Sequence, residues 1–191
     1  YLFSPTLDSE FEFSVYSLST DIQDNNPPFT QVVFDDVVIV GIGAVGNGLI
    51  WALSNIENLS GKIQLVDNES ISISNLQRYI LFEENDEKRI KVEIAKRFFN
   101  QKELNVSVSK GKWSDYVKER GDYNIQCVAV GIDNKKDRIG IQSTLPNIIF
   151  NAFTEDNSIG ITRHKDFNKS ACLSCSYVPL RKERDYINEV A

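Results

Sequence analysis

The sequence predicts an α/β protein built around a mostly parallel, doubly wound sheet with helices on both faces. Three observations lead to this prediction. Short β-branched runs alternate along the chain with segments of helical periodicity. The first of these runs passes directly into a glycine-rich turn, as a strand does when it leads into a helix. The 191 residues are 41% hydrophobic and 25% charged, a composition typical of a globular protein with a sizeable core.

Changes in pattern divide the chain into three parts. Residues 1–31 alternate apolar and polar side chains before the turn-rich stretch DNNPP, so we interpret them as an N-terminal extension. Residues 32–178 carry the strand and helix patterns and form the predicted main domain. Residues 179–191 are expected to begin a further segment, and the lack of methionine even at residue 1 suggests a fragment of a longer protein.

The first strand, first helix and second strand are the clearest elements. Residues 32–40 end in a compact β-branched run, which predicts a strand buried on both faces. Apolar residues recur at helical spacing over residues 49–56, so a helix is expected after the turn. Residues 62–67 form a second run of the buried type, which predicts the second strand.

The second half of the chain continues the alternation. Charged residues separate Ile90, Ile94 and Phe98, which predicts an amphipathic helix over residues 86–99. Three further apolar runs predict strands at residues 105–109, 124–130 and 147–153. Strands that alternate with helices favour a parallel sheet, because parallel neighbours need crossover connections.

The glycine turn predicts a phosphate site. Gly41, Gly43 and Gly46 form G-x-G-x-x-G between a strand and a helix, where backbone N–H groups can approach a phosphate closely. Asp67 ends the second strand, where a carboxylate can accept ribose hydroxyls in a Rossmann-like fold. This signal alone does not separate an ATP site from a nicotinamide site, or either from a glycine turn without a ligand.

The residues after the second strand are more specific. In order along the chain they are Asp67 and Glu69; Ser74, Asn75, Leu76 and Arg78 of an S-N-L-x-R element; Lys91; and Asp133, Asn134 and Arg138 of a D-N-x-x-x-R element. This ordered set resembles the ubiquitin-activating-enzyme-like (ThiF-type) adenylating enzymes, in their bacterial form with Tyr79 after the arginine. The resemblance extends from residue 37 to about residue 178. One departure is Lys88, which stands where that family usually has glycine.

The resemblance implies an adenylyltransferase. Such an enzyme uses ATP to adenylate the C-terminal carboxylate of a ubiquitin-like or sulfur-carrier protein ending in Gly, and it releases pyrophosphate. By the resemblance, Arg78, Lys91 and Asp133 are the catalytic residues, with Lys91 as a mobile point charge and Asp133 holding Mg²⁺. The nucleotide-binding residues would be Gly41, Gly43, Gly46, Asp67, Glu69, Asn75 and Asn134. Taken singly, Arg78 and Lys91 would be read as surface charges and Asp133–Asn134 as a turn.

Cys172 and Cys175 form a C-x-x-C pair. That spacing matches half of a tetrahedral zinc site, and the resembling family has a structural zinc. A redox pair and two ordinary thiols are the alternatives. Cys127 lies in an apolar run and is expected in the core.

Three other conspicuous side chains are given no chemical role. His164 is expected on the surface. Trp51 and Trp113 are expected to pack in the interior, since one belongs to the helix after the glycine turn and the other follows a predicted strand.

Charge and hydropathy restrict the partners and the compartment. A net charge of −6 disfavours nucleic acid as a partner, because phosphate binding needs a clustered basic face. No apolar run approaches the roughly 20 residues of a membrane span, so no membrane partner and a cytoplasmic location are expected. The resemblance implies a homodimer or a pseudo-symmetric heterodimer.

Three rival functions stay open at this point. The first is adenylation of a short peptide in natural-product biosynthesis. The second is an NAD-dependent oxidoreductase, which would account for the glycine turn and Asp67 but leaves Asn75, Arg78, Lys91 and Asp133 without a role. The third is a non-catalytic partner subunit that binds a ubiquitin-like protein without using ATP.

Overall fold

The structure is a computed structural model that describes residues 31–100, 102–155 and 158–177. The chain divides into two compact units, Tyr1–Val32 and Val33–Ala191, and nearly all described residues belong to the second. The N-terminal extension up to residue 30 and the segment 179–191 lie outside the described residues.

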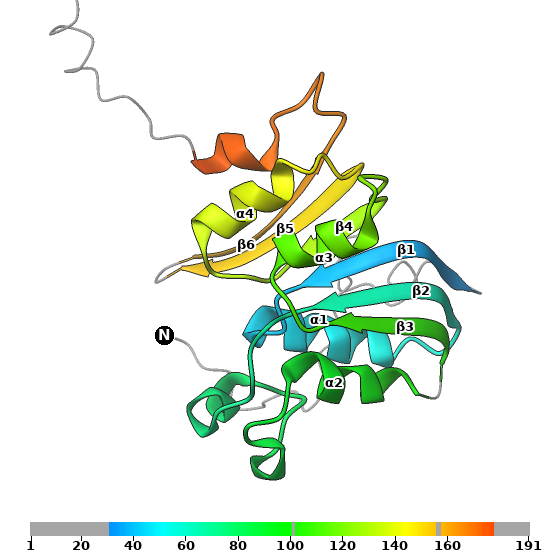
Figure 1. Cartoon of the computed structure of the whole chain (residues 1–191), viewed down its shortest axis with the longest axis vertical. Coiled ribbons are helices and arrows are strands. Elements are labelled where there is room, and N and C mark those ends of the chain that lie inside the picture. The colour runs from blue at the N-terminus through cyan, green and yellow to red at the C-terminus, as the bar shows by residue number, and fades with distance from the viewer. Residues whose placement is uncertain (1–30, 101, 156–157, 178–191) are drawn as a thin grey trace, which may run out of the picture. The chain divides into compact units, whose positions relative to one another are not determined.

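Six strands form one mixed sheet in the order β3-β2-β1-β4-β5-β6 (Figure 1). The pairs β2–β3, β1–β4 and β4–β5 are parallel, and β6 runs antiparallel to β5. The prediction of a mostly parallel, doubly wound sheet is therefore confirmed. The strands are β1 (Val32–Val40), β2 (Leu59–Val66), β3 (Glu103–Ser109), β4 (Cys127–Val130), β5 (Ile148–Glu155) and β6 (Ser158–Lys165).

Strand β6 was not predicted from the sequence. Its side chains alternate, but in the opposite sense to an ordinary half-buried strand. Ile159 and Ile161 are 84% and 77% exposed, whereas His164 is buried. Because the apolar side chains face outward and polar ones inward, the pattern does not resemble the usual strand of a sheet.

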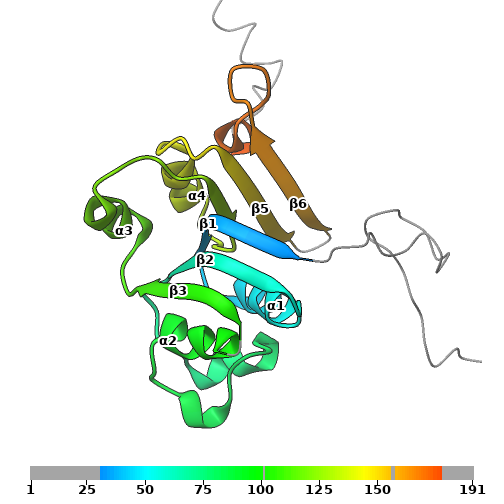
Figure 2. The same ribbon diagram turned by 90° about the vertical axis from the view of Figure 1, so that its right-hand side faces the viewer.

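Helices cover both faces of the sheet, as predicted. Figure 2 shows α1 and α2 on one face and α3 and α4 on the other. None of the helices within the described ranges is long and apolar enough to cross a bilayer. The helices are α1 (Ala44–Ser54), α2 (Lys91–Lys96), α3 (Trp113–Arg120) and α4 (Lys135–Gln142).

The single helix predicted over residues 86–99 is wrong in its extent. The segment contains a 3₁₀ turn, η2 (Glu84–Asp86), then α2 from Lys91, then a second 3₁₀ turn, η3 (Arg97–Phe99). Lys88 lies between η2 and α2 and has a φ of 67°, in the left-handed region that favours glycine. A residue in that region interrupts a right-handed helix, so α2 begins only after it.

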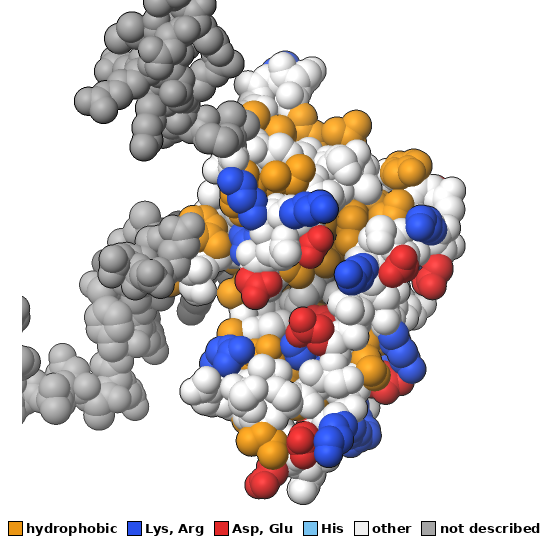
Figure 3. Space-filling view, turned by 60° about the vertical axis from the view of Figure 1, so that its left-hand side comes forward, with side chains coloured by type: hydrophobic (Ala, Val, Ile, Leu, Met, Phe, Trp, Pro, Cys, Tyr) orange, Lys and Arg blue, Asp and Glu red, His pale blue; other side chains and the backbone are white. Residues whose placement is uncertain are grey.

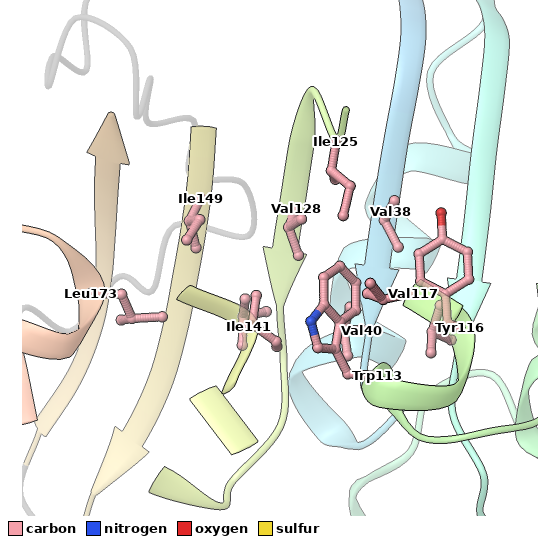
Figure 4. Packing of buried hydrophobic residues seen from close by; sticks show 12 residues of the cluster. Val38, Val40, Trp113, Tyr116, Val117, Ile125, Val128, Ile141, Ile149 and Leu173 are labelled. Carbon is pink, nitrogen blue, oxygen red and sulfur yellow. The ribbon is translucent and has the colours of Figure 1, made fainter. Parts of the chain in front are cut away.

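The core on the α3 and α4 face positions the strand ends that form the site (Figure 4). Val38 and Val40 of β1 pack beside Val128 of β4, under Trp113 of α3 and Ile141 of α4. All five are buried, and each such side chain stabilises the fold by about 1.5–3 kcal/mol. Leu173, from the 3₁₀ turn η4 (Leu173–Tyr177), closes the far side of the same cluster.

The structure tests four expectations for individual side chains. Trp113 is buried, as predicted. Trp51 is 49% exposed, so the prediction that it packs in the interior is wrong; it lies on the outer side of α1. His164 is buried rather than on the surface, because its ring bonds to the backbone oxygen of Ala171 and to the hydroxyl of Thr162. Cys127 is half-buried.

Candidate functional site

A pocket of about 1210 Å³ opens where the carboxyl ends of the parallel strands meet. Gly41 follows β1, Asp67 follows β2, and Gly131 follows β4, and all three line it. The chain continues from β1 toward β2 on one side, whereas β4 and β5 extend the sheet on the other. Such a switch point in an open α/β sheet is where ligands ordinarily bind.

The glycine turn lines this pocket through Gly41 and Gly43. Gly41 has a φ of 86°, and its N–H donates to the backbone oxygen of Val66 at 2.9 Å. Gly46 lies in the first turns of α1, where an added Cβ would stand only 2.1 Å from the Gly41 oxygen. The close approach of turn and helix therefore requires glycine at both positions. Gly43 precedes α1 and lines the pocket.

Gly131 supports the turn from the neighbouring strand, a role that sequence reasoning missed. Its N–H donates to the backbone oxygen of Val40 at 2.8 Å. A Cβ on Gly131 would lie 3.0 Å from the Gly41 oxygen, so the two loops touch through their backbones. The only signal in the sequence is a glycine directly after a buried strand.

Asp67 ties the end of β2 to the glycine turn. One carboxylate oxygen accepts the N–H of Ile42 at 2.6 Å, and the other accepts the N–H of Glu69 at 2.7 Å. Burial raises the pKa of Asp67 above its ordinary value of 3.8, and the two backbone hydrogen bonds oppose part of that rise. Each oxygen retains a free lone pair, so a ribose hydroxyl can still be accepted.

Lys91 opens α2 and points into the site. Its side chain is 2% exposed, so it is not the mobile point charge that the sequence predicted. The ammonium donates to the Glu69 carboxylate and, at 3.1 Å, to the Tyr79 hydroxyl. Burial acts to lower the pKa of Lys91, but these two hydrogen bonds, together with the charges of Asp67 and Tyr79, leave that pKa raised. Lys91 is therefore a fixed positive charge.

Arg78 and Asn75 belong to the 3₁₀ turn η1 (Ile73–Arg78), and the structure places them differently. Arg78 is exposed and lines the pocket, with one N–H donated to the backbone oxygen of Ser74 at 3.1 Å. The Asn75 side-chain oxygen instead accepts the N–H of Ser72 at 3.3 Å, which closes the start of the turn. Among the described residues, Asn75 is not part of the pocket lining.

Asp133 and Asn134 follow β4, and their side chains do different things: one caps a helix and, among the described residues, the other lies free in the pocket lining. Asn134 caps α4, since its side-chain oxygen accepts the N–H groups of Lys136 at 2.8 Å and Asp137 at 3.2 Å. Asp133 is exposed, lines the pocket, and makes no hydrogen bond or ion pair with another described residue through its carboxylate. A free carboxylate beside a phosphate site fits Mg²⁺, which is commonly held by one or two carboxylates and the phosphates of the substrate.

A buried polar wall closes the other end of the pocket. Arg138 donates to the Asn151 side-chain oxygen at 2.6 Å and to the Tyr177 hydroxyl at 3.1 Å. Asn151 in turn donates to the Thr162 hydroxyl at 3.2 Å. Asn151, Thr162 and Tyr177 come from β5, β6 and η4, so no spacing in the sequence could have brought them together.

Cys172 and Cys175 lie close to each other, with their Sγ atoms 3.5 Å apart. The backbone N–H of Cys175 lowers the pKa of the Cys172 thiol. The pair has the spacing found in half of a tetrahedral zinc site, and the described residues contain no group of three or more side chains that could hold a metal ion. A zinc ion held by this pair together with further ligands stays a prediction.

Figure 3 turns the left-hand side of Figure 1 forward, and on that face acidic and basic side chains lie interspersed. Neither the acidic nor the basic side chains form a continuous patch on that face.

The chain matches the ThiF family model over residues 29–185. An uncharacterised protein of Sinorhizobium fredii (strain NBRC 101917 / NGR234), y4jF, is 36% identical over 180 residues, which are 94% of this chain and 35% of that protein. The NEDD8-activating enzyme E1 catalytic subunit of Dictyostelium discoideum is 30% identical over 116 residues, 59% of this chain and 25% of the subunit. The chain thus spans about a third of the first relative and a quarter of the second.

Solved structures of E. coli MccB share the fold. The complex with ATP superposes with a TM-score of 0.59 at 25% identity and covers 81% of this chain and 48% of MccB. The complex with MccA-N7isoASN gives a TM-score of 0.61 at 24% identity, over 82% of this chain and 48% of MccB.

Proposed function

The chain belongs to the ThiF family of ubiquitin-activating-enzyme-like adenylyltransferases, and from this premise we propose that it binds Mg·ATP and adenylates a terminal carboxylate. One observation carries the proposal. A single pocket at the strand ends gathers the glycine turn, the acidic end of β2, two cations and a free carboxylate, contributed by Gly41, Asp67, Arg78, Lys91 and Asp133.

The chemistry explains why each of these groups is needed. A carboxylate oxygen attacks the α-phosphorus of ATP, a new acyl–phosphate bond forms, and the bond to the β-phosphate oxygen breaks so that pyrophosphate leaves. Because both reactants are anions, their approach requires fixed positive charge. Lys91 supplies a buried ammonium at the glycine turn, and Arg78 supplies an exposed guanidinium that can bind phosphate oxygens in pairs.

The remaining groups orient the nucleotide. The free N–H groups at the start of α1 favour phosphate, and Asp67 accepts a ribose hydroxyl while it holds the turn. Asp133 would hold Mg²⁺, which when bound neutralises charge on the phosphates. The wall of Arg138, Asn151 and Tyr177 is not required for the phosphates and is left to receive the incoming carboxylate.

The substrate we propose is the C-terminus of a ubiquitin-like or sulfur-carrier protein, in line with the similarity to the NEDD8-activating subunit. A short peptide is the second candidate, because the similar MccB structures include a complex with N-formylated MccA. We also propose a dimer as the working assembly. Light scattering of the chain tests it, and a single species near 22 kDa would exclude a homodimer of these 191 residues.

The experiment that tests the proposed function compares nucleotides first and carriers second. Isothermal titration should show ATP binding in the presence of Mg²⁺ and no NAD binding. ATP–pyrophosphate exchange should then depend on an added carrier protein with a free C-terminal glycine or on an added peptide. Tight NAD binding without ATP binding would restore the oxidoreductase hypothesis. ATP binding without exchange for any carboxylate would favour the non-catalytic partner.

A further inference from the structure

We propose that Tyr79 is a positioning residue for two of the cations that line the pocket. It holds Lys91 through its hydroxyl and Arg78 through the backbone that it anchors. The effect that we expect on catalysis rests on the proposed function. The positioning itself is a property of the free protein and is measurable without a nucleotide.

The first argument is burial. The turn η1 contains no buried residue, and Ile80 after it is 57% exposed. Tyr79 between them is only 8% exposed, and its ring packs edge-on against Phe82 with centroids 5.6 Å apart. Tyr79 is therefore the first buried residue after η1, and Arg78 is the residue directly before it.

The second argument is the set of contacts around the lysine. The Lys91 ammonium lies 3.1 Å from the Tyr79 hydroxyl and 5.1 Å from the ring centroid, while the Arg78 guanidinium carbon lies 5.4 Å from the same centroid. A Cβ on Gly43 would be 3.9 Å from that hydroxyl, so the tyrosine reaches the phosphate turn. One side chain thus contacts both cations and the turn.

The third argument is the number of donors. An ammonium has three N–H donors, and Glu69 and Tyr79 accept two of them. Lys91 lines the pocket, so its third donor remains for an anion there. Without the Tyr79 hydroxyl the ammonium would have Glu69 as its only protein partner among the described residues. Glu69 is 65% exposed, so water competes for its carboxylate, whereas the Tyr79 hydroxyl is the sheltered partner that holds the buried ammonium in place.

The test uses Tyr79→Phe, which removes the hydroxyl and retains the ring. Tyr116→Phe is the matched control, because Tyr116 is also buried and accepts a hydrogen bond from a cation, Arg120, at 2.9 Å, but does not line the pocket. The first readout is competitive labelling of the lysines with an amine-reactive reagent, resolved by mass spectrometry across about pH 8–11, the range that brackets the usual lysine pKa.

The Tyr79 hydrogen bond is one of the causes that raise the pKa of Lys91; the others are the bond with Glu69 and the charges of Asp67 and Tyr79. Its loss should therefore lower that pKa and increase the unprotonated fraction about five-fold at a fixed pH, as expected for one hydrogen bond. Following the label across pH separates this effect from easier access of the reagent. Tyr116→Phe should leave Lys91 unchanged.

The second readout is ATP–pyrophosphate exchange. Tyr79→Phe should lower kcat about ten-fold with little change in the KM for ATP, since the charge is retained but no longer held in place. An unchanged Lys91 pKa in Tyr79→Phe would overturn the positioning role even if wild-type exchange is robust. A shifted pKa in a protein that shows no exchange would support the positioning role and count against the proposed function alone.

Discussion

The carboxylate of Asp67 holds Ile42, the residue between the first two glycines of the turn, through a 2.6 Å hydrogen bond from the Ile42 N–H. The residue that ends β2 therefore fixes the shape of the loop that follows β1. An acidic strand end and a glycine turn are often considered as two contacts to one nucleotide. Here they also contact each other, so a change at either should affect both.

The first prediction concerns the pH dependence of stability at Asp67. Burial raises its folded-state pKa above 3.8, so the folded protein binds a proton more tightly than the unfolded chain. The contribution of Asp67 to the free energy of unfolding is thus fully present in acid and falls as pH rises from 3.8 through the raised pKa. Denaturant unfolding of the wild type and Asp67→Asn between about pH 3 and 7 measures it.

The asparagine variant leaves one backbone N–H without an acceptor, which costs about 1–3 kcal/mol at every pH. That offset does not depend on pH, whereas the Asp67 titration does. The wild-type advantage should therefore shrink toward neutral pH. An advantage that grows with pH would mean that the hydrogen bonds from Ile42 and Glu69 outweigh burial.

The second prediction compares two glycines of the same helix. Gly46→Ala should destabilise the protein by about 2–3 kcal/mol, because the new Cβ would stand 2.1 Å from the Gly41 oxygen and must push turn and helix apart. Gly48→Ala should stabilise it by about 0.5–1 kcal/mol, because nothing lies within 4 Å and alanine is the better helix former. Thermal unfolding of both variants decides it, and equal effects would contradict the close contact.

The third prediction separates a phosphate-binding arginine from a surface arginine. Arg78→Ala should reduce ATP–pyrophosphate exchange about 100-fold or more, the usual loss for a preorganised charge partner, with the melting temperature nearly unchanged. Arg89→Ala is the control, since Arg89 is in the same segment and pairs with Asp86 but does not line the pocket. Similar exchange rates in the two variants would reduce Arg78 to an ordinary surface charge.

The fourth prediction concerns the metal ion. Asp133→Asn removes a charge without breaking any contact among the described residues, so unfolding should be unaffected. Exchange should fall about 100-fold, and more Mg²⁺ should be needed for half-maximal rate, because one carboxylate ligand is lost. Glu119→Gln, which changes an exposed acid outside the pocket, should alter neither quantity. An unchanged Mg²⁺ dependence in Asp133→Asn would remove this residue from the metal site.

The sequence predicted the parts of the fold that depend on local patterns. Residues 32–40 were expected as a strand and form β1 with the same bounds, because a β-branched run before a glycine turn has few alternatives. The glycine turn, Asp67 and Asp133 line one pocket because each follows a strand end. Lys91, which opens α2, and Arg78, which ends η1, line the same pocket. Motif order along the chain was enough to find them.

What the sequence missed depends on contacts between distant segments. Lys91 looks like a surface lysine until Glu69 and Tyr79 surround it, and Tyr79 shows no role in its own motif. The buried wall of Arg138 and Asn151 likewise needs β5 to lie beside α4. Lys88 shows the reverse case. A resemblance marked the position as unusual, but only the backbone, at a φ of 67°, shows that the helix could not begin before it.

The pairing of β1 with β4 also bears on the order in which this protein is made. Val37 pairs with Cys127 and Val40 with Val130, so the paired residues of that ladder lie 90 positions apart in the chain. On the ribosome the glycine turn emerges long before Gly131, the residue that supports it. A nascent chain that ends before β4 carries β1 with one edge unpaired, a state that invites association with other chains. Assembly of the nucleotide pocket is therefore a late event in the synthesis of this domain.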